Sequence, residues 1–217
     1  MASFQEIFDK TEVFLKKKGI SSEIAKGELA STADLEYFEQ QSGLILPDSF
    51  SLFYTSFANG FNFCWEFEEE IQGQFAMPTL LQLGETYRDW RSNVQDFYKD
   101  PNSLDRCVEL VFRTEAFAVW RRMEPWVPFW NEGNGDHFCV DSKTGQIVYD
   151  QHDWYDGFGS LTKTNGILAG HDFGNFLHNW SRFCFLPNTG HWWGEFGKFG
   201  AIKWSPEFFN PKFYRQE

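Results

Sequence analysis

The chain has 217 residues, a formal net charge of −12, and a content of Phe, Trp and Tyr that reaches 20%. This length can bury one substantial core without disulfide or metal cross-links, and the acidic charge disfavours nucleic acids and anionic membranes, which are bound by clustered Lys and Arg. The charge favours a basic partner, or it simply keeps an aromatic-rich protein in solution. The rings are expected to pack in the core, with aromatic contact surfaces as the alternative.

The cysteines of the chain are isolated in the sequence. None forms a C-x-x-C pair or has a histidine at zinc-ligand spacing, so we expect buried free thiols, no metal site and no cofactor. The first ten residues contain Glu6 and Asp9 and lack an apolar signal core, and no run of 18 apolar residues occurs. These features predict a cytoplasmic protein with no membrane partner. The cysteines are Cys64, Cys107, Cys139 and Cys184.

Two amphipathic helices are predicted near the N-terminus. Apolar residues recur at helical spacing over 3–18, and three lysines precede Gly19, as is typical of a helix C-terminus. The segment Ser31–Asp34 has the form of a capping box, which predicts a second helix over 33–42 with Gly43 as its C′ residue.

A third helix and a strand follow. Pro47 is placed in the first turn of the helix, which stops at Asn59-Gly60. Residues 61–67 alternate apolar and polar side chains, the pattern of a half-buried strand, and the acidic run Glu68–Glu70 comes next. The longest helical pattern covers 79–98, with Thr79 as its N-cap.

The chain then changes from helices to strands. Residues 103–123 are ambiguous: 115–123 favours a helix, whereas 107–112 could equally extend as a strand. Strands are predicted at 126–130, 137–141 and 146–149, and the last two form a hairpin because Gly145 suits the turn between them. A loop and then a helix over 171–180 follow. Beyond 187, scattered aromatic residues and two prolines indicate an extended arm.

Three stretches of the chain resemble the SUKH superfamily, which includes fungal glucan-synthesis regulators and bacterial toxin-immunity proteins. They are LPDSFSLFYTSFANG at 46–60, WVPFWNEGNGDHFCVDSKTGQIVYDQHDW at 126–154, and FGNFLHNW at 173–180. Each motif alone is weak, but their order and joint presence make chance agreement improbable. The positions that match the family pattern are Leu46, Pro47, Phe50, Phe53, Asn59, Gly60, Gly135, Asp136, Asp141, Gly145, Val148, His152, Asp153, Phe173 and Leu177.

The resemblance implies an α+β fold of one domain, with a mainly antiparallel sheet flanked by helices. The SUKH-like domain is expected over 1–187, with a helical insertion at about 78–124. The remaining segment, 188–217, is expected to be an aromatic C-terminal extension packed on the domain.

Three candidate sites for chemistry are weak. Glu132–Asp136 lacks the ligand spacing of an EF-hand and is better explained as a tight turn. The pair His152-Asp153 has no recognisable nucleophile or oxyanion donors beside it, and the resemblance favours a structural turn there. His191–Gly194 could join other aromatic residues in a sugar-binding or peptide-binding platform, but covering the core is the simpler role. We therefore expect no catalytic residues.

The hypothesis that remains is a non-catalytic protein-binding module, specifically an immunity protein that occludes a basic, nuclease-like toxin domain. The alternative is a regulatory scaffold resembling the fungal glucan-synthesis and cell-wall regulators. Acidic and aromatic residues in two loops are the predicted partner contacts. They are Asp136, Asp150, Asp153, Trp154, Tyr155 and Asp156, with Glu66, Glu68, Glu69 and Glu70 as a second acidic patch.

Overall fold

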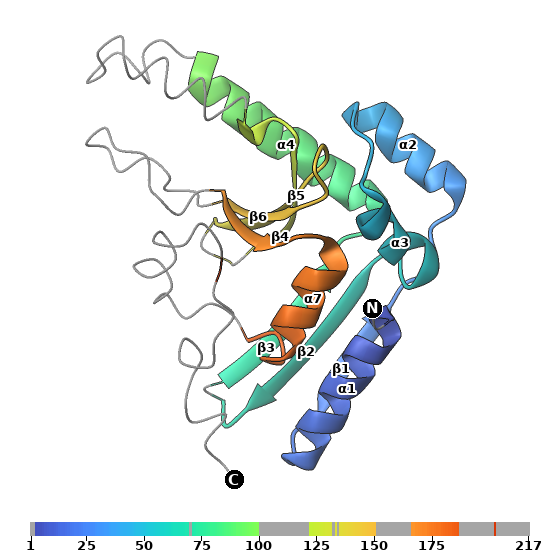
Figure 1. Ribbon diagram of the computed structural model, residues 1–217, viewed down its shortest axis with the longest axis vertical. Helices are drawn as coiled ribbons and strands as arrows, with labels where there is room; N and C mark the ends of the chain where they lie inside the picture. The colour runs from blue at the N-terminus through green and yellow to red at the C-terminus, as the bar shows by residue number, and fades with distance from the viewer. Residues whose placement is uncertain are drawn as a thin grey trace, which may run out of the picture.

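The structure is a computed structural model that describes residues 3–69, 71–99, 122–131, 133, 135–150, 166–186 and 202. Its elements form two antiparallel sheets with helices beside them, which confirms the predicted α+β class (Figure 1). In chain order they are α1 (Phe4–Lys17), β1 (Ser22–Lys26), α2 (Thr32–Ser42), α3 (Asp48–Ser56), β2 (Phe61–Phe67), β3 (Ile71–Met77), α4 (Leu80–Lys99), β4 (Trp126–Asn131), β5 (His137–Asp141), β6 (Ile147–Asp150), β7 (Ile167–Gly170) and α7 (Phe173–Ser181).

Local signals set the helix ends where the sequence predicted them. The capping box of α2 forms, since the Ser31 hydroxyl accepts from Asp34 N–H and the Asp34 carboxylate accepts from Ser31 N–H. Gly43 ends that helix in the left-handed conformation, with φ at 72°. Thr79 caps α4, because its hydroxyl accepts from the Gln82 backbone N–H.

The first sheet has the strand order β1-β2-β3, and only β2 was predicted. The side chains of β1 are exposed or half-buried, so the strand carries no apolar alternation. The sequence of β3 does alternate, with Ile71, Gly73, Phe75 and Met77 buried between more exposed residues. The alternation was missed because glycine and glutamine are uncommon in strands.

The second sheet has the order β4-β5-β6-β7 and contains the predicted β5–β6 hairpin. The Asp141 carboxylate accepts from the backbone N–H groups of Lys143 and Thr144, and Gly145 follows with φ at 74°. Strand β7 lies in a segment that had been assigned to a loop, because its four residues are too short for a periodic signal.

The core is built from aromatic rings that join both sheets to α1, α3 and α7. Phe8 of α1 lies within 4.4–5.7 Å of the rings of Phe57, Phe61, Phe63 and Phe75, measured between centroids. Buried ring pairs of this kind contribute both apolar area and preferred edge geometry. Most aromatic residues of the described segments are thus used inside the protein.

Parts of the predicted domain organisation lie outside the described residues. Helix α4 forms the first part of the expected insertion at about 78–124, and 100–121 lies outside. Ile202 is the one described residue of the extension at 188–217; it is buried, and its N–H donates to the Leu168 carbonyl at 2.7 Å. None of the described helices is both long enough and apolar enough to cross a membrane.

Two glycines of the core give opposite predictions for substitution by alanine. A Cβ at Gly73 of β3 would collide with the Trp65 indole and the Cys184 carbonyl, so we expect Gly73→Ala to lower the free energy of unfolding by about 2 kcal/mol or more. A Cβ at Gly84 of α4 would meet only Phe38, at 3.6 Å. Gly84→Ala should therefore be neutral or stabilise by about 0.5–1 kcal/mol. Urea unfolding of both variants tests the pair, and equal effects would contradict it.

Candidate functional site

Two of the predicted partner contacts are buried. Asp136 is 1% exposed and accepts a hydrogen bond from the Tyr149 hydroxyl at 2.6 Å. Asp150 is 3% exposed and accepts from the Trp90 indole N–H at 3.1 Å. The prediction is therefore wrong for these two carboxylates, because side chains inside the β5–β6 region cannot touch a partner. Local sequence carries no signal for this burial, since the hydrogen-bond donors lie on α4 and on β6.

The buried carboxylate of Asp150 also lies beside a histidine and a cysteine. His137 Nδ1 is 3.8 Å from Asp150 Oδ2, and the Asn131 side-chain nitrogen is 3.1 Å from His137 Nε2. Burial, with a further contribution from the Asp150 charge, raises the pKa of the Cys139 thiol well above its ordinary value. This thiol stays protonated at neutral pH, so the geometry suits packing rather than nucleophilic attack.

The acidic hairpin, defined as Glu66, Glu68 and Glu69, is exposed as predicted at the turn between β2 and β3. Glu68 and Glu69 both adopt left-handed backbone angles, with φ at 55° and 57°. Such angles cost non-glycine residues about 1–2 kcal/mol each. The hairpin therefore carries its charge on a tight turn that points into solvent.

Six of the named residues cannot be placed. Glu70, His152, Asp153, Trp154, Tyr155 and Asp156 lie outside the described residues. The turn that contained the weak metal candidate is partly described, and Gly133 and Gly135 have φ at 81° and 98°, as expected for a tight turn. Among the described side chains, no group of three or more His, Cys, Asp or Glu could hold a metal ion.

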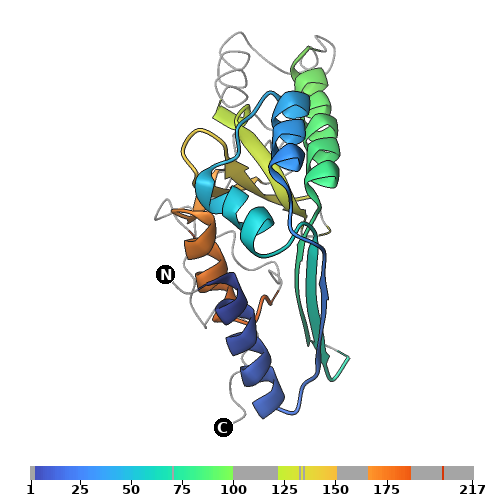
Figure 2. The same ribbon diagram turned by 90° about the vertical axis from the view of Figure 1, so that its right-hand side faces the viewer.

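The outer face is the side of the first sheet that points away from α1 and α7, which lie together on its other side (Figure 2). The pairing register places alternate residues of the three strands on this face. Each of these residues is exposed or half-buried. Two are acidic and none is basic. These residues are Glu23, Ala25, Asn62, Cys64, Glu66, Gln72, Gln74 and Ala76.

The groove, our name for the hollow where the outer face meets α4 and β4, has a volume of about 800 Å³. It forms because the edge strands of the two sheets, β3 and β4, meet here. One wall is the exposed side of α4, with Glu85 and Asp89 one turn apart. The apolar part of its lining includes Ala76 and Trp130, which are half-buried, and Met77 and Phe129, which are buried. Sequence reasoning missed the groove, since its walls come from segments that only tertiary packing brings together.

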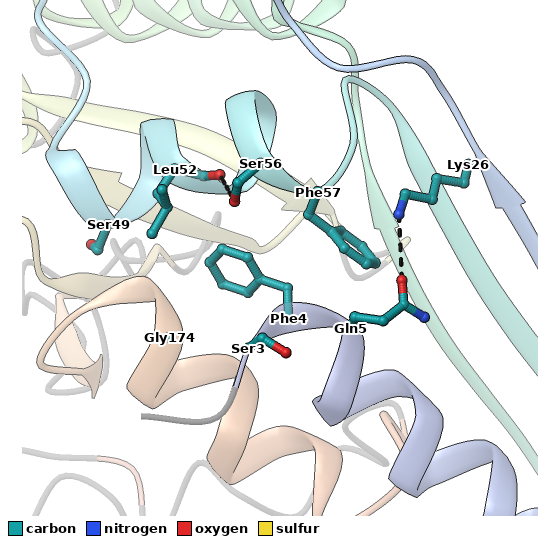
Figure 3. Close-up of a pocket in the computed structure, with 9 residues that line it drawn as sticks. All are labelled: Ser3, Phe4, Gln5, Lys26, Ser49, Leu52, Ser56, Phe57 and Gly174. Carbon is teal, nitrogen blue, oxygen red and sulfur yellow. Dashed lines mark hydrogen bonds between the residues drawn. The ribbon is translucent and has the colours of Figure 1, made fainter.

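A second, smaller cavity of about 330 Å³ lies on the other side of the sheet, between the N-terminal turns of α1 and α7 and the length of α3 (Figure 3). Phe4, Leu52 and Phe57 line it. Lys26 extends over it, with Nζ 4.1 Å from the Phe57 ring centroid and 3.4 Å from the Gln5 side-chain oxygen. The lysine is thus directed toward α1 and away from the outer face.

No family model matches the chain, and no curated protein matches it either.

The burial of Asp136 predicts a stability effect in place of a binding effect. Asp136→Ala leaves the buried Tyr149 hydroxyl without this acceptor, so we expect the free energy of unfolding to fall by about 1–3 kcal/mol. Asp89→Ala, at an exposed position, should change it by less than about 0.5 kcal/mol. Equal effects in chemical unfolding would show that the Asp136 hydrogen bond adds little.

The thiols should differ in reactivity. Burial raises the pKa of Cys184 to about 12, and Cys139 is also buried, whereas Cys64 is half-buried on the outer face. In a Cys107→Ser variant, which removes the cysteine outside the described residues, only Cys64 should react with Ellman's reagent at neutral pH before unfolding. Rapid labelling of a second native thiol would contradict this assignment.

Proposed function

We propose that this chain is a non-catalytic protein-binding module that holds a basic protein partner on its outer face and groove. An immunity protein that neutralises a nuclease-like toxin by occlusion is the specific form of this proposal. It would act in the cytoplasm, without a cofactor.

The groove is the observation that carries the proposal. The half-buried Ala76, Pro78 and Trp130 of its lining can cover the aliphatic stem of a Lys or Arg side chain. Glu85 and Asp89 stand on the wall where the cationic head would lie. Trp130 is half-buried in the same place and supplies an aromatic surface for a guanidinium group. A mixed acidic and aromatic site of this kind is better suited to a cationic side chain than to a phosphate.

The charges around the groove also favour a cationic partner. Gln74 and Ala76 belong both to the groove and to the outer face, and Glu66 lies on that face next to Gln72. The acidic hairpin continues the surface at the other end of β3. None of the outer-face residues of β1, β2 and β3 is basic. An acidic surface of this kind accelerates association with a basic protein and lowers the affinity for acidic competitors.

The SUKH resemblance is a second, independent support. It rests on motif order over 46–60 and 126–180, and it stays a proposal because no family model matches. The α+β class agrees with it, although a fold class is shared by many functions.

The test compares two double charge reversals that change the net charge equally. Glu85→Lys/Asp89→Lys alters the groove, and Glu36→Lys/Glu39→Lys alters α2, which packs against the side of α4 marked by Gly84. Tagged proteins would be used to capture partners from the source cells at low and high salt. We expect the groove variant to lose a basic partner at least tenfold, about 1.4 kcal/mol, while the α2 variant retains it.

Equal loss in both variants would show that only net charge matters, and the groove would be excluded as the site. Capture of cell-wall or signalling enzymes, with no basic protein, would favour the scaffold alternative.

A further inference from the structure

Strand β1 is the open edge of the first sheet. The order β1-β2-β3 leaves its second side unpaired by any described strand, and Figure 2 shows it along the outer edge of that sheet. Its residues from Glu23 to Lys26 are exposed, including the apolar Ile24 at 40%. An exposed edge of this kind is a template for another extended chain.

The pairing register tells which backbone groups face outward. Gly27 N–H donates to the Gly60 carbonyl, and the same antiparallel register pairs Ala25 with Asn62 and Glu23 with Cys64. Because neighbouring residues alternate in direction, these three direct their N–H and C=O groups toward β2. The N–H and C=O groups of Ser22, Ile24 and Lys26 therefore point to the open edge.

The side chains around this edge are apolar at its centre and acidic on both sides. Ile24 lies at the middle of the strand, and Glu23 projects on the outer face. On the opposite side, Glu12 of α1 accepts from the Ser22 hydroxyl, and Asp9 lies one turn earlier in the same hollow.

Two lysines are also near the edge. Lys26 is directed back toward Gln5 and the Phe57 ring (Figure 3), and Lys16 lies at the far end of the hollow between α1 and β1, next to Gly19. The central part of the edge is therefore bordered by Asp9, Glu12 and Glu23, which favour cationic side chains in an incoming strand.

We infer that β1 receives an extended segment of the partner as an added strand of the first sheet. The inference rests on the proposed function, since it assigns the binding mode of the same basic partner. The segment pairs its backbone with Ser22, Ile24 and Lys26, places an apolar residue opposite Ile24, and places basic residues beside Glu23. The five residues of β1 span about 17 Å, which five to seven residues of the partner match.

A second copy of this chain fits the edge poorly. Antiparallel pairing of two β1 strands about a two-fold axis at Ile24 would place Glu23 opposite Ala25 of the other copy, with no charge pair. The same axis would bring the two α1 helices to one side of the joined sheet, so that Asp9 and Glu12 approach their own counterparts.

Synthetic peptides test the binding mode without knowledge of the partner. The probe is a fluorescent seven-residue peptide of alternating Lys and Val, and a peptide with the same composition in blocks is its control. In the paired strand, the valines that face Ile24 also direct their amides toward β1. N-methylation of the valines should therefore weaken binding at least tenfold in fluorescence anisotropy, while N-methylation of the lysines should change it less than twofold.

A variant of β1 tests the same backbone pairing in the protein. Ile24→Pro removes an N–H that faces the open edge and keeps the ladder to β2, so unfolding should remain cooperative while peptide affinity falls at least tenfold. Glu23→Lys leaves the backbone intact and should lower the affinity for the same peptide at least threefold. This variant replaces Ile24→Pro in the test if the proline variant does not fold.

The outcomes separate this inference from the proposed function. Strand addition would be overturned if the alternating peptide and its two N-methylated forms bound equally well. If their affinity nevertheless fell in Glu85→Lys/Asp89→Lys, the groove would remain as the site. A dimer in ultracentrifugation that Ile24→Pro abolishes would overturn it in favour of a second copy. Failure of every basic peptide, together with no basic partner in the capture experiment, would remove both proposals.

Discussion

The contact of Phe75 with rings from both sheets is the interaction on which the rest of the structure depends. Phe75 is fully buried on β3, and its ring lies 6.2 Å from Trp130 of β4, 5.9 Å from Trp180 of α7 and 5.7 Å from Phe8 of α1, between centroids. Burying a side chain of this size contributes about 2–3 kcal/mol. More importantly, it holds the edge of the first sheet against the edge of the second, and the groove exists because these edges meet.

The same burial determines which side of the first sheet meets solvent. Once Phe63, Trp65 and Phe75 face α1 and α7, the strand period of two directs Cys64, Glu66 and Gln74 outward. A shift of one residue in the register would bury the glutamate and expose the rings. The acidic outer face and the aromatic core are therefore consequences of one packing arrangement.

The carboxylates discussed above are either buried and hydrogen-bonded or exposed, and the two classes have different roles. Asp136 is held inside by Tyr149 of β6, and Asp150 accepts from Trp90 and so connects the second sheet to α4. The carboxylates of Glu66, Glu85 and Asp89 are exposed and leave their charge available to a partner. The proposed binding of a basic protein depends on the second class, and the stability of the body beneath it depends on the first.

The sequence by itself determined the features whose causes are local. The capping box of α2, the glycine at the end of that helix, the Gly145 turn and the alternation of β2 each depend on residues within a few positions, so they were predicted correctly, together with the α+β class. The exposure of Glu66, Glu68 and Glu69 followed from their place beside a strand end. Tertiary structure alone decided that Asp136 and Asp150 are buried, that exposed β1 is a strand, and that β3, α4 and β4 enclose a groove. These features depend on contacts between segments far apart in the chain, and hydrophobic periodicity carries no information about which segments meet.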